Sequence, residues 1–307
     1  MQRTANPIRP RTVDDLLPSQ LIARLDPLDL ASRKVFFGKL KGERRSKKRG
    51  ESVEFADHRP YVTGDDLRHI DWNIYARLDG LFLKLFLEEE DLSLHLVLDC
   101  SASSDCGEPS KFLFMQRAAA ALGYIGLVNL NRVAVTAMGP AENGITGSLR
   151  DLRGRRRLHD MATFLSKLQP QGSFEFQAAA ERIAQTRRGK GVMLVFSDFF
   201  FKDGYEQGLK LLVGRGYEVF CVQVLSPQEI QPDITGDLRL KDVEDGDLAE
   251  VTISAPLLKR YKAMLGAYCE RLRTFCGERG MTHMVARSDT PIDTLILEEL
   301  RRRGVVR

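Results

Sequence analysis

The stretch "LSLHLVLDCSASSD", residues 92–105, decides the fold prediction. A run rich in leucine and valine leads into Asp99, which is typical of a strand buried inside a sheet. Two hydroxyl side chains, Ser101 and Ser103, follow the aspartate at alternate positions. Three interpretations fit this ending: a helix cap, a catalytic serine or a metal site.

Apolar strands and helices alternate along the rest of the chain. This alternation predicts an α/β fold with a doubly wound, mostly parallel sheet covered by helices on both faces. An Asp-Gly pair at 245–246 predicts the turn of a hairpin within residues 238–253. Further strands are expected at 131–138, 191–198, 217–225 and 281–286, and helices at 111–128, 156–168, 174–186, 204–216 and 257–280.

The composition is that of a folded globular protein. Hydrophobic residues make up 43% of the 307 residues and charged residues 29%, with a formal net charge of +4. The five cysteines form no CxxC pair, which favours reduced thiols in a cytoplasmic protein over a disulfide framework. The N-terminus has no signal-peptide pattern, and the most apolar helix, 112–128, is interrupted by Gln116 and Arg117. We therefore expect a cytoplasmic protein without a transmembrane segment.

A second apolar strand, 191–198, also ends in an aspartate, Asp198. The carboxyl ends of parallel strands meet at one edge of a sheet, so Asp99 and Asp198 should lie close together and repel each other unless a cation neutralises them. The nearby hydroxyls include Ser173 in the loop "QPQGSFEF". Carboxylate and hydroxyl oxygens are hard ligands that suit Mg²⁺, Mn²⁺ or Ca²⁺. A metal site at this edge is therefore one interpretation of the two aspartates and of the nearby hydroxyls of Ser101, Ser103, Ser173 and Ser197.

Two other interpretations of this stretch stay open. In the first, Asp99 or one of the serines caps the helix that follows. A nucleophilic serine would need a base and an oxyanion site, yet the sequence contains no GxSxG motif, and the five histidines show no supporting pattern. The chain also lacks a P-loop and an HExxH motif. We expect a protein that is not an enzyme.

Two features resemble known families. Asp99-x-Ser101-x-Ser103 after an apolar strand resembles the metal-ion-dependent adhesion site (MIDAS) of von Willebrand factor A domains. The segment "GESVEFADHRPYVTGDDLRHIDWNIYARLDGLFLKLFLEEE" resembles the signature of the DUF58 family, closely from Gly50 to Ser103 and loosely to about residue 290. The residues that agree in order are Arg59, Tyr61, Gly64, Asp65, Asp66, Arg68, Asp71, Trp72, Ala76, Arg77 and Lys84.

The resemblance implies a non-enzymatic module that binds a divalent cation and a protein. It implies a MoxR-type AAA+ ATPase as partner, in chaperone-like maturation of complexes, with an acidic side chain of the partner completing the metal shell. Carried over residue by residue, the adhesion site implies five metal ligands in this chain: Asp99, Ser101, Ser103, Ser173 and Asp198. The family site usually has a threonine in the second loop, where this chain has Ser173. The implied domains are an N-terminal segment with the DUF58 signature (1–90), a von Willebrand factor A-like domain (91–290) and a C-terminal helix with a basic tail (291–307).

Charged residues before Asp91 permit two further interpretations. Residues 33–49 contain nine Lys and Arg and one acid, so an alternative function is binding of nucleic acid or an anionic membrane surface through this stretch. The acidic Asp65, Asp66 and Asp71 are expected to pair with Arg59, Arg68 and Arg77 in a polar network, since buried charges need partners.

Overall fold

The computed structural model describes residues 9–10, 12–31, 54–63, 65–87, 92–186, 191–214 and 216–307. The basic stretch 33–49 lies outside these residues, so the function predicted for it stays a prediction. The chain divides into two compact units. The smaller is Val35–Asp91, and the larger combines Met1–Lys34 with Leu92–Arg307.

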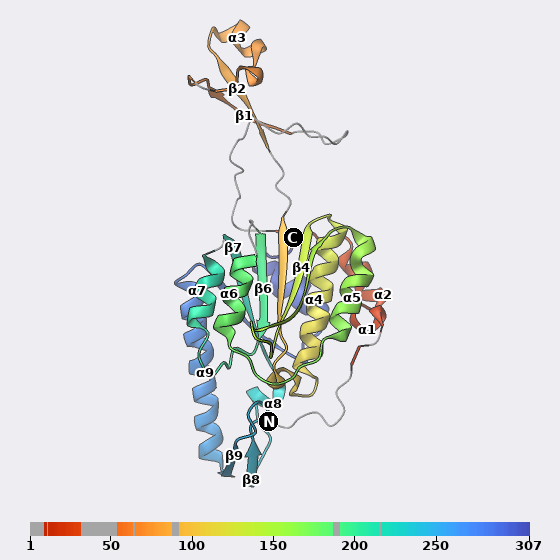
Figure 1. Cartoon of the computed structure of the whole chain (residues 1–307), viewed down its shortest axis with the longest axis vertical. Coiled ribbons are helices and arrows are strands. Elements are labelled where there is room, and N and C mark those ends of the chain that lie inside the picture. Colours follow the sequence, from red (N-terminus) through yellow and green to blue (C-terminus); the bar gives the residue numbers. More distant parts are fainter. Residues whose placement is uncertain are drawn as a thin grey trace. The chain divides into compact units, whose positions relative to one another are not determined.

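A six-stranded sheet forms the centre of the larger unit (Figure 1). Its order is β10-β7-β6-β3-β4-β5, and only the edge strand β5 runs antiparallel to its neighbour. In chain order the strands therefore lie 3-2-1-4-5-6, which confirms the predicted doubly wound, von Willebrand factor A-like sheet. The strands are β3 (Ser93–Asp99), β4 (Arg132–Met138), β5 (Ile145–Leu152), β6 (Gly191–Ser197), β7 (Tyr217–Leu225) and β10 (Thr282–Arg287).

Helices cover both faces of this sheet (Figure 1). One hydrophobic core lies under α4 and α5, and a second lies under α6, α7 and the C-terminal half of α9. Although α4 is buried on nearly every side, none of the helices among the described residues is both long and apolar enough to cross a membrane. The helices are α4 (Lys111–Val128), α5 (Leu158–Lys167), α6 (Phe176–Thr186), α7 (Glu206–Val213), α8 (Pro227–Ile230) and α9 (Ala255–Gly277), with short 3₁₀ turns at Ala102–Asp105 (η2) and Arg155–Arg157 (η3).

Both ends of the chain belong to the larger unit, which differs from the predicted boundaries at 90 and 291. Helices α1 (Val13–Leu16) and α2 (Ser19–Leu25) pack against α4 through buried leucines. Helix α10 (Ile292–Thr294) and the helical turn η4 (Leu295–Leu300) join the same core, and Leu30 forms a bridge with Val306. These termini are part of the domain because their apolar side chains complete its core.

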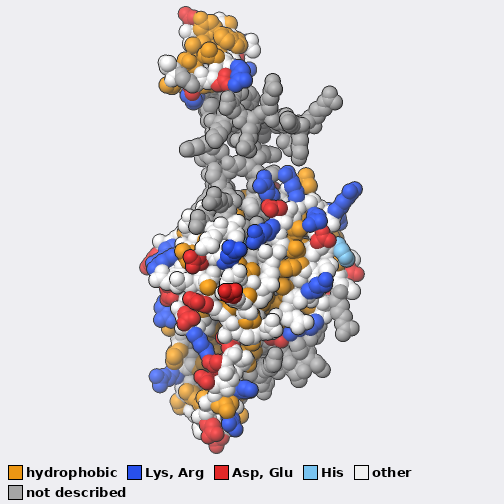
Figure 2. Space-filling model, viewed as in Figure 1, with side chains coloured by type: hydrophobic (Ala, Val, Ile, Leu, Met, Phe, Trp, Pro, Cys, Tyr) orange, Lys and Arg blue, Asp and Glu red, His pale blue; other side chains and the backbone are white. Residues whose placement is uncertain are grey.

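The smaller unit is built from β1 (Glu54–Pro60) and β2 (Phe82–Leu87), which pair antiparallel, with η1 (Leu67–His69) and α3 (Trp72–Leu78) between them. The predicted polar network forms in part: Arg59 pairs with Asp65 at 2.7 Å and Arg68 with Asp66 at 2.6 Å. Asp71 pairs instead with His58 at 3.0 Å and Lys84 at 3.3 Å, and it caps α3. Apolar side chains that do not pack inside this unit gather on its surface (Figure 2): Val62, Leu67, Trp72, Tyr75, Leu78 and Leu81.

A hairpin of β8 (Gly236–Lys241) and β9 (Leu248–Ile253) confirms the predicted turn. Within the described residues its strands pair only with each other, and the hairpin lies beyond the sheet, near α8 and the N-terminal end of α9 (Figure 1). The loop 242–247 at its tip reaches the carboxyl edge of the central sheet, where Glu244 lines a pocket.

Candidate metal centre

The strand order reverses between β3 and β6, where binding sites of doubly wound sheets lie. The two strands pair in parallel up to Leu98 and Phe196, so the residues that follow them lie together. The Ser197 hydroxyl donates to Asp99 Oδ2 at 2.6 Å, and the Ser101 amide donates to Asp99 Oδ1 at 2.8 Å. Asp99 and Asp198 therefore meet at one edge, as the sequence predicted.

Asp99 is fully buried. Burial of the carboxyl group and the nearby Asp198 carboxylate raise the pKa of Asp99 to about 6, although Ser197 and Ser101 partly offset this shift. The side chain does not cap the next helix. Ser110 caps α4 by accepting a hydrogen bond from the Leu113 amide at 3.4 Å. The cap interpretation of Asp99 is therefore wrong.

The serine hydroxyls gather beside Asp99. Ser101 Oγ lies 3.0 Å from Ser103 Oγ and 3.4 Å from Ser104 Oγ. The loop carrying Ser173 is joined to this turn by two backbone hydrogen bonds, from Ala102 to Gly172 at 2.8 Å and from Gln171 to Cys100 at 2.9 Å. Ser101 and Ser173 consequently line one pocket.

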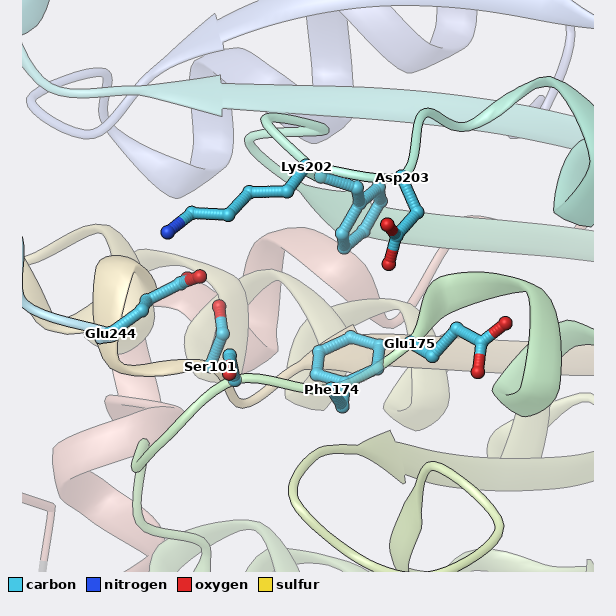
Figure 3. Close-up of a pocket in the computed structure, with 8 residues that line it drawn as sticks. Ser101, Phe174, Glu175, Lys202, Asp203 and Glu244 are labelled. Carbon is cyan, nitrogen blue, oxygen red and sulfur yellow. The ribbon is translucent and has the colours of Figure 1, made fainter.

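This pocket has a volume of about 340 Å³ and opens at the carboxyl edge of the sheet (Figure 3). Hydroxyl groups and charged side chains line it together with two aromatic rings, Phe174 and Phe201, whose centroids are 5.7 Å apart. Phe199, by contrast, is fully buried. The other lining residues are Glu175, Lys202, Asp203 and Glu244.

Asp198 has a different environment from Asp99. The Lys111 ammonium, itself fully buried at the first residue of α4, lies 2.8 Å from Asp198 Oδ2 and 2.7 Å from Glu229 Oε1. Burial lowers the pKa of Lys111, but the two carboxylates outweigh this effect and raise it. Asp198 Oδ1 accepts the Phe200 amide at 3.1 Å. An ammonium therefore already neutralises part of the charge at this strand end.

Reasoning from sequence missed Lys111 and Glu229. Glu229 belongs to a capping box at the start of α8, in which the Ser226 amide donates to Glu229 Oε2 at 2.7 Å and the Glu229 amide donates to Ser226 Oγ at 3.2 Å. The signal S-x-x-E after an apolar strand could have located the glutamate. Nothing in the local sequence assigns it to a lysine 118 residues away.

The sequence also missed Glu244, from the tip of the β8–β9 hairpin. Burial raises the pKa of the Glu244 carboxyl group, and so do the neighbouring carboxylates of Asp198 and Asp99, whereas the nearby Ser103 hydroxyl partly offsets this rise. Glu244 therefore lies within electrostatic reach of both strand-end aspartates.

The donor set fits a hard divalent cation. Two buried carboxylates, those of Asp198 and Glu229, share the buried Lys111 ammonium, whereas the buried Asp99 carboxyl group accepts hydrogen bonds from neutral donors. Among the residues that the structure describes, no three His, Cys, Asp or Glu side chains gather as metal ligands. Hydroxyl and carboxylate oxygens at this edge are hard ligands, which suit Mg²⁺ better than zinc.

Comparisons with known proteins give a family and several relatives. The model of the family described as "Protein of unknown function DUF58" matches residues 57–267. "Uncharacterized protein Rv1480" of Mycobacterium tuberculosis is 27% identical over 302 residues, which cover 95% of this chain and 93% of the relative. "Uncharacterized protein MAV169" of Mycobacterium avium is 30% identical over 136 residues, or 43% of this chain and 79% of that protein.

Similar solved structures have low sequence identity. The conserved hypothetical protein BatB from Bacteroides thetaiotaomicron is 14% identical with a TM-score of 0.42, over 69% of this chain and 98% of that one. Manganese-loaded TRAP protein of Plasmodium vivax is 13% identical with a TM-score of 0.33, over 67% of this chain and 72% of that one.

Proposed function

We propose a function for this chain, which belongs to the DUF58 family: it is a non-catalytic module that binds a partner protein through a divalent cation. Ser101, Ser103 and Ser173 would hold the ion, with Asp99 and Asp198 beside them. The observation that carries this proposal is an excess of buried carboxylate over ammonium directly beside a pocket lined by serine hydroxyls.

The surrounding residues position the ligands. Ser197 and the Ser101 amide orient Asp99, and Lys111 fixes Asp198 from the side of α4. When bound, the cation supplies a positive centre to which a carboxylate of the partner can bind. Mg²⁺ usually keeps several waters, which leaves positions open for such a carboxylate.

We propose a binding role for Ser101. Its hydroxyl lies 3.0 Å from Ser103 Oγ and 3.4 Å from Ser104 Oγ, and it also forms a hydrogen bond with the Asp99 carboxyl group. These contacts hold the hydroxyl oxygen beside the carboxylates of the sheet edge, where it can serve as a ligand of a hard cation.

A MoxR-type AAA+ ATPase in the cytoplasm is the partner that the family resemblance suggests. The chemistry of the pocket supports a partner with an exposed acidic side chain, which would complete the shell of Mg²⁺, Mn²⁺ or Ca²⁺. Pull-down of such an ATPase with the full chain should succeed in Mg²⁺ and fail in excess chelator. Equal recovery of the ATPase in both conditions would contradict the proposal that the partner binds through the cation.

Thermal unfolding tests the metal site. Mg²⁺ binds the folded state, so it should raise the melting temperature, with about 2.7 kcal/mol of stabilisation at a hundredfold excess over its Kd. The rise should disappear in Asp99→Ala and in Asp198→Ala. Glu181→Gln on α6 removes an exposed carboxylate away from the pocket and should keep the rise. No rise in the wild-type chain would contradict the proposal.

A further inference from the structure

The tip of the β8–β9 hairpin places an acidic side chain where a partner's carboxylate is expected. Glu244 lines the pocket with Ser101 and Ser173. Its carboxyl group and the Ser101 hydroxyl point toward one another (Figure 3). The Ser103 hydroxyl lies near enough to offset part of the rise in the pKa of Glu244. The chain thus offers its own carboxylate to the hydroxyls proposed as metal ligands.

The tip is held in place by one lysine. Lys202, from the loop after β6, forms an ion pair with Asp245 and lies 3.4 Å from Asp242 Oδ2. Both acids flank Glu244, whose own amide donates to Asp242 Oδ1 at 2.8 Å. These contacts join the tip to the strand that ends in Asp198, and they orient Glu244 toward the pocket.

The hairpin itself is a weakly anchored element. Each of its strands has six residues, and within the described part of the chain they pair only with each other. An isolated two-stranded hairpin is marginally stable in water, so displacing this tip costs little compared with opening the central sheet. Lys202 is exposed, which limits the strength of its ion pairs.

We propose that Glu244 is an internal occupant of the partner's position: in the free chain the hairpin tip covers the serine hydroxyls, and an acidic side chain of the partner displaces it. This inference rests on the proposed function. The Phe174 and Phe201 rings at the same pocket favour a partner whose acidic residue lies next to an apolar one.

Proton relaxation of water by bound Mn²⁺ tests this occupancy. Glu244→Ala should raise the relaxivity of each bound Mn²⁺ because water takes the place of the carboxylate. Lys202→Ala should also raise the relaxivity of each bound Mn²⁺, but by less, because the tip keeps Glu244 and is only held more loosely. Glu250→Ala removes a carboxylate from the same hairpin away from the pocket and should leave the relaxivity unchanged.

A short peptide then tests displacement. The peptide KDVEDGDL, residues 241–248, should lower the relaxivity of the Glu244→Ala chain toward the wild-type value, and its Glu244→Gln analogue should not. In the wild-type chain the tethered tip has an effective concentration in the millimolar range, so the peptide should bind there about tenfold more weakly or worse.

The possible failures are distinguishable. If the wild-type chain binds no Mn²⁺, the proposed function itself fails. If it binds Mn²⁺ and Glu244→Ala has the same relaxivity as the wild-type chain, the metal site is supported. The proposal that Glu244 occupies the partner's position is then overturned. If Glu244→Ala abolishes Mn²⁺ binding, Glu244 is an integral ligand, and the proposal that a partner replaces it is overturned as well.

Discussion

The carboxylates at the ends of β3 and β6 are stabilised in opposite ways. Asp99 accepts hydrogen bonds from a hydroxyl and a backbone amide, both neutral, and burial raises its pKa to about 6. Asp198 lies 2.8 Å from a buried ammonium that Glu229 shares. The β6 end is therefore part of the structural core, whereas the β3 end keeps unneutralised charge beside the pocket.

Lys111→Met should have the largest effect, because it leaves Asp198 and Glu229 buried without their cation. Breaking a buried ion pair in this way costs about 3–5 kcal/mol of unfolding free energy. Urea denaturation measures the loss. Lys210→Met on α7 removes an exposed lysine and should change stability by less than about 0.5 kcal/mol. A loss below about 1 kcal/mol in Lys111→Met would show that the ammonium is not structural.

His283 on β10 allows the stability of the contacts at the end of β6 to be tested by changing the pH. Its Nε2 lies 3.1 Å from Gln223 Oε1, and the Gln223 amide group donates to the Asp198 carbonyl at 3.0 Å. Burial, with repulsion from Arg273 and Arg303, lowers the pKa of His283 to about 4.

The unfolded chain therefore binds a proton at His283 near pH 6.5, before the folded chain does. Stability should fall as the pH drops from about 6.5 toward 4, by up to about 3 kcal/mol from this group. In His283→Gln this part of the slope should vanish when denaturation is repeated across the range. An unchanged slope would mean that another group dominates.

Neutralising each aspartate compares the two strand ends directly. In metal-free buffer Asp198→Asn should lose about 2–3 kcal/mol, since a charged hydrogen bond to Lys111 is removed. Asp99→Asn should change stability by less than about 1 kcal/mol, because removal of a buried charge offsets the weakened hydrogen bonds. Denaturation in the presence of chelator measures both losses. A larger loss of stability in Asp99→Asn than in Asp198→Asn would contradict the contrast between the two strand ends.

Ser103→Ala should have the smallest effect on the fold. Its hydroxyl is half-buried and lies 3.0 Å from Ser101 Oγ, so its loss should cost about 0.5–1.5 kcal/mol in metal-free protein. The same substitution should reduce the Mg²⁺-induced rise in melting temperature. An undiminished rise, measured beside the wild-type chain, would exclude Ser103 as a ligand.

The sequence predicted the central sheet because its strands are long apolar runs. β6 and β7 are buried along their whole length, and their pattern cannot be confused with a solvent-exposed hairpin. The edge strand β5 was missed because most of its residues are only partly buried, without an alternation of apolar and polar side chains, and because Gly147 interrupts it. A mixed pattern of this kind carries little periodicity.

The sequence also predicted which residues meet at the carboxyl edge, because parallel strands end together. It could not predict their partners. Lys111 reaches Asp198 across 87 residues, and Glu244 arrives through the placement of a hairpin that no local pattern specifies. These tertiary contacts decide which aspartate is neutralised and which hydroxyls are covered.

Diffraction from Mn²⁺-soaked crystals of the full chain can locate the ion at the sheet edge, because anomalous scattering identifies it without assuming its ligands. We expect a peak at the β3 end, with the oxygens of Ser101 and Ser103 at about 2.0–2.6 Å from the ion, the range for hard cations. A fully occupied peak elsewhere, or none beside Asp99 at saturating Mn²⁺, would contradict the proposed metal site.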